Sequence, residues 1–584
     1  MASITDIITL ENFAFKMPPW EPDLSNHRYA LVDMGSNGIR FSISDLSPPQ
    51  ARLLRCLYRE RAAISLFDAL SSSSSSGHLT FPPEIIIQVS ETLARFKSIA
   101  SDYGVPAEHV SVFATEAMRK AENAASMLDA IRASSGLGVY ILAPEVEALF
   151  GAMGARSGFT DVNGLFLDLG GGSVQMTYVN SSIDNYDTIA AQTGKSLPFG
   201  AARLIKIIES SDRQAQTAAL GDLQASMRST FAQLQQRFPE LKDTQTDPKN
   251  NGIDIYLCGG GFRGYGSILQ HNDPIQPYPV PMIGAYTVEG SFFSRVQSMR
   301  TANSHYEGKI FGMSKRRRQQ FPAIATVVEA LIEAIPRIHT VTFCSGGNRE
   351  GALLMKLPKT VREDSPLPLL HQLGDNMSSQ TLRSVIDTVQ SALPTNTDLS
   401  DVPTVFTLGL GPLFVTNIWK RAGEPSDSNA AFELHQAVTR DPSAPGLTHL
   451  ARAVLGLTLC SRWGANLGPI DKPLYIGLQK LVSRSNLEAN FWAEYLGAIA
   501  SLIAGICPAE PDTSDRLTKA LKFNAKTAIG KKKIKVQLTI SLSPLAYQAL
   551  RSQDLASSFK KVGKNLYTTG NPERKVEVIV QKME

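Results

Sequence analysis

The spacing of apolar and polar residues changes twice along this chain of 584 residues. From Tyr29 to about residue 356, short apolar runs typical of strands alternate with longer segments of helical periodicity. Helical periodicity then prevails to about residue 510, and the tail returns to short alternating runs at Lys535–Ser541 and Lys575–Val580. The pattern predicts an α/β region followed by a mainly helical region that ends in short strands.

The length exceeds what one core covers, so we expect several domains. The pattern favours a flexible N-terminal arm at 1–27, α/β domains at 28–150 and 151–356, and an α+β domain at 357–584. The serine run Ser71–Ser76 predicts a low-complexity surface loop. Further strands are predicted near Leu53–Leu57 and at Val110–Ala114, Val139–Leu142, Ile253–Leu257 and His339–Phe343, with helices at Pro83–Tyr103 and Pro144–Arg156.

Two near-matching segments, 135 positions apart, each place an aspartate at the end of an apolar strand. Asp33 and Asp168 are both followed by a turn of small residues and by a second apolar strand. The backbone N–H groups of such turns can surround a phosphate, although tight hairpins without a ligand have the same pattern. The order of the turns favours a phosphate clamp with a carboxylate on each side. The turns comprise Gly35, Ser36 and Asn37, and Gly170, Gly171, Gly172 and Ser173.

Two other starts of helices are candidates for chemistry. The glycine turn Gly259, Gly260 and Gly261 follows a strand and opens a helix, where an anion could lie against the helix N-terminus. Pro144 begins another helix, with Glu145 and Glu147 in its first turn. Position alone does not distinguish a catalytic glutamate from ordinary helix-end electrostatics.

Short basic clusters have an ordinary explanation. Lys315–Arg318 is more typical of a solvated face than of an anion-binding patch, and Lys531–Lys533 indicates an exposed edge or turn.

Composition narrows the class of protein. A net charge of +4 over the whole chain does not indicate a nucleic-acid binder, and five scattered cysteines suggest neither zinc nor a disulfide framework. The first 27 residues lack the features of a secretory signal or mitochondrial presequence. The longest apolar stretch, Leu496–Cys507, is too short to cross a bilayer and predicts a buried helix. We therefore expect a cytoplasmic protein without a membrane partner.

Six ordered motifs give the chain a family resemblance over roughly residues 28 to 356. They are Asp33–Asn37, Ala114–Ala121, Pro144–Ala148, Asp168–Ser173, the turn at 259–261 and Asn348–Gly351. The chain resembles the exopolyphosphatase/guanosine pentaphosphate phosphatase (Ppx/GppA) family, a branch of the actin-like ATPases, and within it the fungal retrograde regulation protein 2 group. The resemblance implies two ribonuclease-H-like domains with a phosphate chain bound in the cleft between them.

The resemblance also implies roles for the motif residues. Glu147 would orient or deprotonate the attacking water, and Arg119 would contact the transferring phosphate. Asp33 and Asp168 would hold Mg²⁺ through water. Thr115, Gln175 and the three glycine-rich turns would bind the phosphates.

Two departures from the family pattern affect the expected activity. The second turn continues Gly-Ser-Thr-Glu in the hydrolytic members, whereas here it ends in Val174 and Gln175, which carries no charge. Gln175 either merely positions water or phosphate, or marks slowed or lost turnover; we favour slowed turnover. The C-terminal domain is similar to a degenerate His-Asp metal domain, with Leu459–Gly464 at the motif position, so a docking surface is expected there in place of a second hydrolase centre.

Two functions remain as hypotheses. The first is a regulator that binds polyphosphate, ATP or a guanosine polyphosphate and contacts a protein partner; by resemblance it would act in mitochondria-to-nucleus retrograde signalling, with residual Mg²⁺-dependent phosphohydrolase activity. The second is an active exopolyphosphatase or nucleotide phosphohydrolase. A homodimer is compatible with either function.

Overall fold

The computed structural model describes residues 7–73, 78–370, 377–394, 402–529, 534–549, 558–564 and 574–583. These residues form two compact units. The first comprises residues 1–272, 282–364 and 443–445, and the second comprises residues 273–281, 365–442 and 446–584. The predicted domains at 28–150 and 151–356 thus lie in one unit, and that unit continues to Asp364.

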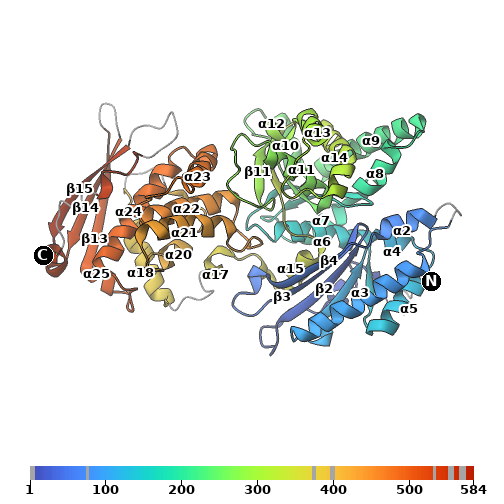
Figure 1. Ribbon diagram of the computed structural model, residues 1–584, viewed down its shortest axis with the longest axis horizontal. Coiled ribbons are helices and arrows are strands. Elements are labelled where there is room, and N and C mark those ends of the chain that lie inside the picture. The colour runs from blue at the N-terminus through green and yellow to red at the C-terminus, as the bar shows by residue number, and fades with distance from the viewer. Residues whose placement is uncertain are drawn as a thin grey trace. The chain divides into compact units, whose positions relative to one another are not determined.

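Domain I of the first unit contains a six-stranded sheet in the order β1-β6-β5-β2-β3-β4. Strands β2, β3 and β4 of this sheet are labelled in Figure 1. Strand β3 is antiparallel to both neighbours, while β2, β5 and β6 are parallel. This is the ribonuclease-H arrangement with one extra edge strand. The strands are β1 Ile7–Ile8, β2 Arg28–Gly35, β3 Gly38–Asp45, β4 Arg55–Ala62, β5 Val110–Ala114 and β6 Val139–Leu142, and the helices are α1 Phe13–Lys16, α2 Leu66–Ser73, α3 Pro83–Asp102, α4 Glu116–Lys120, α5 Ala124–Ser135 and α6 Pro144–Arg156.

Domain II repeats the five-stranded part of this topology, with the sheet order β11-β12-β10-β7-β8-β9, but its extra edge strand β11 is antiparallel to β12 whereas β1 is parallel to β6. Strands β7, β8 and β9 are antiparallel, and β10 and β12 run parallel to β7, as β5 and β6 do to β2. The strands are β7 Asn163–Leu169, β8 Val174–Asn180, β9 Lys195–Leu197, β10 Ile253–Cys258, β11 Tyr286–Glu289 and β12 Ile338–Phe343, and the helices are α7 Tyr186–Thr193, α8 Ala201–Ile208, α9 Arg213–Arg237, α10 Pro239–Thr246, α11 Gly259–His271, α12 Gly290–Phe293, α13 Val296–His305, α14 Lys315–Ala334, α15 Asn348–Lys356 and α16 Lys359–Arg362.

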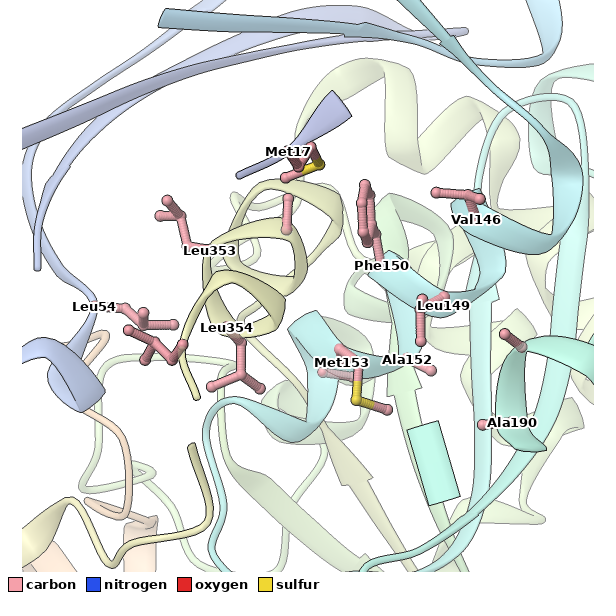
Figure 2. Packing of buried hydrophobic residues seen from close by; sticks show 14 of the residues in the cluster. Met17, Leu54, Val146, Leu149, Phe150, Ala152, Met153, Ala190, Leu353 and Leu354 are labelled. Atoms are coloured by element: carbon pink, nitrogen blue, oxygen red, sulfur yellow. The ribbon is translucent and has the colours of Figure 1, made fainter. Parts of the chain in front are cut away.

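Two helices from different parts of the sequence form the buried centre of the first unit. Apolar side chains of α6, among them Phe150 and Met153, pack beside Leu353 and Leu354 of α15 (Figure 2). A side chain at Gly154 of α6 would overlap the backbone of Gly347, so these helices pack with almost no space between their backbones. Because the first turn of α6 carries Glu147, this packing fixes the place of that glutamate.

The N-terminal segment is not the flexible arm that the sequence predicts, as far as it is described. Ile7 and Ile8 pair with β6, Met17 is buried beside α15, and the Trp20 indole N–H donates to the Leu46 carbonyl at 3.0 Å. A strand of two residues has too little local pattern to be recognised, because its stability comes from the sheet edge that it joins.

Two other predictions changed in this unit. Ser71–Ser73 end helix α2 instead of lying in a loop, and the rest of the serine run lies outside the described residues. Residues 273–281 belong to the second unit, where Arg484 donates to the buried Asp273 carboxylate at 2.5 and 3.0 Å.

The second unit is a helical bundle followed by a three-stranded sheet in the order β13-β14-β15 (Figure 1). The apolar stretch that predicts a buried helix lies in α24, which is long and apolar enough to cross a bilayer, but 72% of that window is buried, as in the core helix of a soluble protein. Lys531–Lys533 lie outside the described residues. The elements are α17 Leu367–Leu370, α18 Ser379–Gln390, α19 Thr404–Thr407, α20 Gly411–Thr416, α21 Ser426–Thr439, α22 His449–Arg462, α23 Lys472–Ser485, α24 Ala489–Ile506, α25 Arg516–Ala520, β13 Leu521–Ile529, β14 Ile534–Leu542, α26 Pro544–Ala549 and β15 Arg574–Lys582.

Candidate phosphate-binding site

The hairpin of domain I buries the first aspartate. Asp33 on β2 lies opposite Arg40 on β3, and the Arg40 Nη1 atom is 3.7 Å from Asp33 Oδ2. Only 3% of Asp33 is exposed, and its Oδ1 accepts no hydrogen bond from any described residue. Burial raises the pKa of Asp33, while Arg40 and Arg349 oppose that rise. A buried carboxylate oxygen without a donor is a position where a cation or a ligand hydrogen would be stabilised.

The hairpin of domain II has the same register. Asp168 on β7 lies opposite Gln175 on β8, and both side chains line one cavity together with Asp33. The third glycine turn packs directly against Asp168: a side chain at Gly259 would overlap the Asp168 carboxylate. Gly259 also has φ +85°, a conformation that favours glycine. It therefore shapes the cavity without lining it, whereas Gly260 and Gly261 line it.

The two aspartate turns meet across the cavity. A side chain at Gly171 would overlap the amide of Asn37, and one at Gly172 would lie 3.5 Å from the Ser36 hydroxyl. The structure thus brings both turns and both aspartates together, as the sequence predicts.

Glu147 enters the same cavity from the first turn of α6. The Arg119 guanidinium donates to Glu147 Oε2 at 2.8 Å and to the Leu142 carbonyl at 2.6 Å. Burial raises the pKa of Glu147 to about 7; Arg119 opposes the rise, and Asp33 and Asp168 add to it. Arg119 does not line the cavity, so the structure gives it a different contact from the predicted phosphate contact: it holds the glutamate.

The cavity has a volume of about 210 Å³ and is built from both domains of the first unit. All predicted site residues except Arg119 and Gly259 line it. The lining residues are Asp33, Gly35, Ser36, Asn37, Gly38, Arg40, Arg61, Thr115, Glu147, Asp168, Leu169, Gly170, Gly171, Gly172, Ser173, Gln175, Ala201, Gly260, Gly261, Arg263, Ser314, Arg316, Arg317, Gln320 and Asn348.

The five arginines that line the cavity were not predicted from the sequence; they are Arg40, Arg61, Arg263, Arg316 and Arg317. No described carboxylate forms a salt bridge with Arg61, Arg263 or Arg317, whereas Arg40 lies near Asp33 and Arg316 pairs with Asp68 at 2.8 Å. Burial, together with the neighbouring arginines Arg263, Arg40 and Arg61, lowers the pKa of Arg317 to about 10. Mutually repelling guanidinium groups in one cavity are stabilised by a ligand with several negative charges.

The basic cluster at the start of α14 is not simply a solvated face. Arg316 and Arg317 line the cavity, and Arg316 also donates to the Asn37 side chain of domain I at 2.8 Å. Arg318 instead donates to backbone carbonyls, among them that of Gly308 at 3.1 Å. Basic residues are unfavourable at the N-terminus of a helix, which is the positive end of the helix dipole. Their position in the first turn of α14 therefore indicates a site for an anion, and the sequence alone could have shown this.

The position of Arg40 in the cavity could also have been predicted from the sequence. A two-residue turn between β2 and β3 fixes the register that places Arg40 opposite Asp33.

Mg²⁺ fits the donors of this cavity. Asp33 with its unpartnered oxygen and Asp168 offer carboxylates. The side-chain oxygens of Gln175, Asn348 and Asp168 each lie within 4 Å of the point that a Cβ at Gly151 would occupy. Among the described residues, no cluster of three His, Cys, Asp or Glu side chains could enclose a metal by itself. Mg²⁺ commonly takes one or two carboxylates and completes its shell with water and phosphate oxygens, so this donor set suits it.

The repeated ribonuclease-H topology and the shared cavity give the first unit the two-domain fold of the actin-like ATPases. The chain belongs to the Ppx/GppA phosphatase family, whose model matches residues 46–360, and a model of the RTG2 C-terminal domain matches residues 368–584.

Known proteins are similar to this chain over different shares of its length. The chain is 32% identical over 498 residues to Retrograde regulation protein 2 of Saccharomyces cerevisiae, which covers 83% of this chain and 82% of that protein. It is 26% identical over 340 residues to Exopolyphosphatase 1 of Mycobacterium leprae, which covers 56% of this chain and 89% of that protein. The crystal structure of an exopolyphosphatase from Cytophaga hutchinsonii matches with a TM-score of 0.42 and 20% identity, covering 58% of this chain and 99% of that one.

Proposed function

We propose that this protein is a cytosolic regulator that binds a phosphate-chain or nucleotide ligand with Mg²⁺ and hydrolyses it slowly. The observation that supports this most is the cavity in which aspartates from both domains face five arginines. A ligand that carries several phosphates can contact both domains at once, and Mg²⁺ can bridge its oxygens to the carboxylates.

Hydrolysis would use residues that are already in place. Glu147, held by Arg119, would accept a proton from water as the water oxygen bonds to the terminal phosphorus and the phosphoanhydride bond breaks. The arginines and the turn N–H groups would stabilise the charge on the phosphoryl oxygens. Bound Mg²⁺ would neutralise part of the phosphate charge, with Asp33 and Asp168 as its holders.

Slow turnover is proposed because of Gln175. This amide lies opposite Asp168, where the hydrolytic members carry a carboxylate, and it can act neither as a base nor as a charged metal ligand. The arginines, the glycine-rich turns and the two aspartates that would bind the ligand with Mg²⁺ all line the cavity.

An active exopolyphosphatase or guanosine polyphosphate phosphohydrolase is the second candidate. The burial of Glu147 favours it, because burial raises the pKa of this glutamate to about 7 and a general base with such a pKa is suited to neutral pH. The similarity to bacterial exopolyphosphatases agrees with this candidate.

A regulatory role fits a ligand that contacts two domains. Such a ligand shifts a conformational equilibrium to the extent that it binds one state more tightly. The similarity to Retrograde regulation protein 2 supports a role in retrograde signalling, with a protein partner that reads the shifted state.

One experiment distinguishes the two candidate functions. Ligand affinity and phosphate release should be measured on the purified full chain with ATP, guanosine tetraphosphate and long-chain polyphosphate, each with and without Mg²⁺. Measurable Mg²⁺-dependent affinity with slow release supports the regulator, and rapid release supports the enzyme. No affinity for any of these ligands would contradict both.

A further inference from the structure

The last 69 residues carry a strong positive charge that the phosphate site does not explain. From Arg516 to the end there are 15 Lys and Arg but only 4 Asp and Glu, whereas the whole chain has a net charge of +4. The rest of the chain is therefore acidic overall, and the basic residues collect in the segment that forms the three-stranded sheet of the second unit.

One face of this sheet is polar and basic. On β14, Val536, Leu538, Ile540 and Leu542 are fully buried, so the alternate residues face outward. The strand registers place the outward residues of β13 and β15 beside them. The outward face consists of Lys522, Asn524, Lys526, Ala528, Lys535, Gln537, Thr539, Ser541, Lys575, Glu577, Ile579 and Gln581.

On the other face of the sheet, the apolar side chains are less buried on β15 than on β14. Val576, Val578 and Val580 pair with fully buried residues of β14, yet these three valines are only partly buried. Among the described strands, β15 pairs with β14 alone. A row of half-covered valines beside an unpaired strand edge is suited to an additional strand whose apolar side chains would complete the cover.

The charge selects the occupant. Lysines along an edge strand repel a second copy of the same edge and discourage self-association. The outward face presents no aromatic ring among the residues named above, so it lacks the stacking platform that single-stranded nucleic acid uses. An extended protein segment with alternating apolar and acidic residues would satisfy both sides of β15, with its apolar residues against the valines and its carboxylates near Lys575 on the outward face and near Lys582 at the end of the strand. Glu577, which lies between these two lysines on β15, is paired with Lys535 of β14 at 2.6 Å.

We propose that the basic sheet, defined as β13, β14 and β15, binds an acidic partner protein by adding an extended segment of that partner beside β15. Backbone hydrogen bonds along the edge would provide affinity, and the lysines would select for acidic side chains and speed association. This surface lies apart from the phosphate cavity in the sequence and shares no residue with it, so the proposal does not depend on the proposed function.

The test uses the full chain and a labelled peptide of alternating Val and Glu, with fluorescence anisotropy as the readout. Two matched peptides serve as controls: one has Lys in place of Glu, and the other has Pro at alternate positions, which removes backbone donors. We expect only the Val-Glu peptide to bind, and its affinity to fall as salt is added.

Charge reversal on the protein locates the surface. Lys575→Glu together with Lys582→Glu, which reverses both lysines of β15, should weaken binding of the Val-Glu peptide about tenfold or more. Lys480→Glu, an exposed lysine of helix α23, is the matched control and should leave affinity unchanged. These substitutions replace exposed side chains, and circular dichroism checks that the variants fold.

Several results would overturn the proposal. They are equal binding of the Lys peptide, undiminished affinity of the double variant, or tighter binding of a single-stranded RNA that displaces the Val-Glu peptide. Dimerisation of the full chain that Lys575→Glu abolishes would assign the edge to a second copy and equally contradict an acidic partner.

Discussion

The two aspartate hairpins share one register but differ in the residue that faces the carboxylate. In domain I that residue is Arg40, and in domain II it is Gln175. Arg40 partly compensates the charge of the buried Asp33, whereas the uncharged amide leaves Asp168 without a cation across the strand pair. We therefore expect Asp168 to depend more than Asp33 on a bound cation, while both carboxylates contribute to one metal site.

The same comparison separates binding from chemistry. Turns and arginines from both domains line the cavity, and Glu147 of α6 is the residue proposed to accept a proton. We therefore expect ligand affinity to survive a change at Glu147 and turnover to depend on it.

The largest effect is expected at Glu147. Glu147→Ala should reduce phosphate release by about 10²–10⁴-fold, the range of general acid-base catalysis, and leave ligand affinity within about tenfold. Single-turnover phosphate release and isothermal titration measure the two quantities. An equal loss of affinity would show that Glu147 binds the ligand and does not activate water.

Gln175→Glu tests the difference between the hairpins. A carboxylate at this position should raise phosphate release by about a hundredfold at most, because it adds a charged group beside Asp168. Gln319→Glu adds the same charge at an exposed position of α14 that does not line the cavity, and it should change release little. Unchanged release by Gln175→Glu would mean that the amide is not what slows turnover.

The burial of Glu147 predicts a pH dependence of stability. The pKa of this group is raised from 4.5 in the unfolded chain to about 7 in the folded protein, so the folded state takes up a proton between these values. The free energy of unfolding should therefore decrease by about 2 kcal/mol from this source as the pH rises from about 5 to about 8. Urea unfolding without Mg²⁺ should show a shallower pH slope for Glu147→Gln, and identical slopes would contradict the raised pKa.

The smallest effect is expected from a single arginine. Arg316→Gln should weaken tripolyphosphate binding about tenfold and reduce its salt dependence, because one of five cations is lost. Arg318→Gln is a matched control, since Arg318 contacts backbone carbonyls outside the cavity. Equal losses of affinity in both variants would indicate a general charge effect in place of a specific contact.

The sequence predicts the elements whose pattern is local. Both aspartate hairpins are present, and helix α6 from Pro144 to Arg156 and strand β5 from Val110 to Ala114 have the predicted bounds. In these segments, periodicity, capping and turn residues all indicate the same structure.

Features that depend on tertiary contacts could not be predicted in this way. Strand β1 has only Ile7 and Ile8, and the arginines of the cavity come from β3, β4, α11 and α14, which are distant in the sequence. The role of Arg119 also needed coordinates, because motif position does not distinguish a phosphate contact from a contact with Glu147.

The most direct test of a metal shared by both hairpins is a double-mutant cycle on Asp33→Asn and Asp168→Asn. The measured quantity is the Mg²⁺-dependent part of the tripolyphosphate affinity. If both carboxylates hold one ion, each single variant should lose most of this part, and the double variant should lose little more, a coupling of about 1 kcal/mol or greater. Additive losses, or a single variant that keeps the full Mg²⁺ dependence, would contradict a shared metal between the two domains.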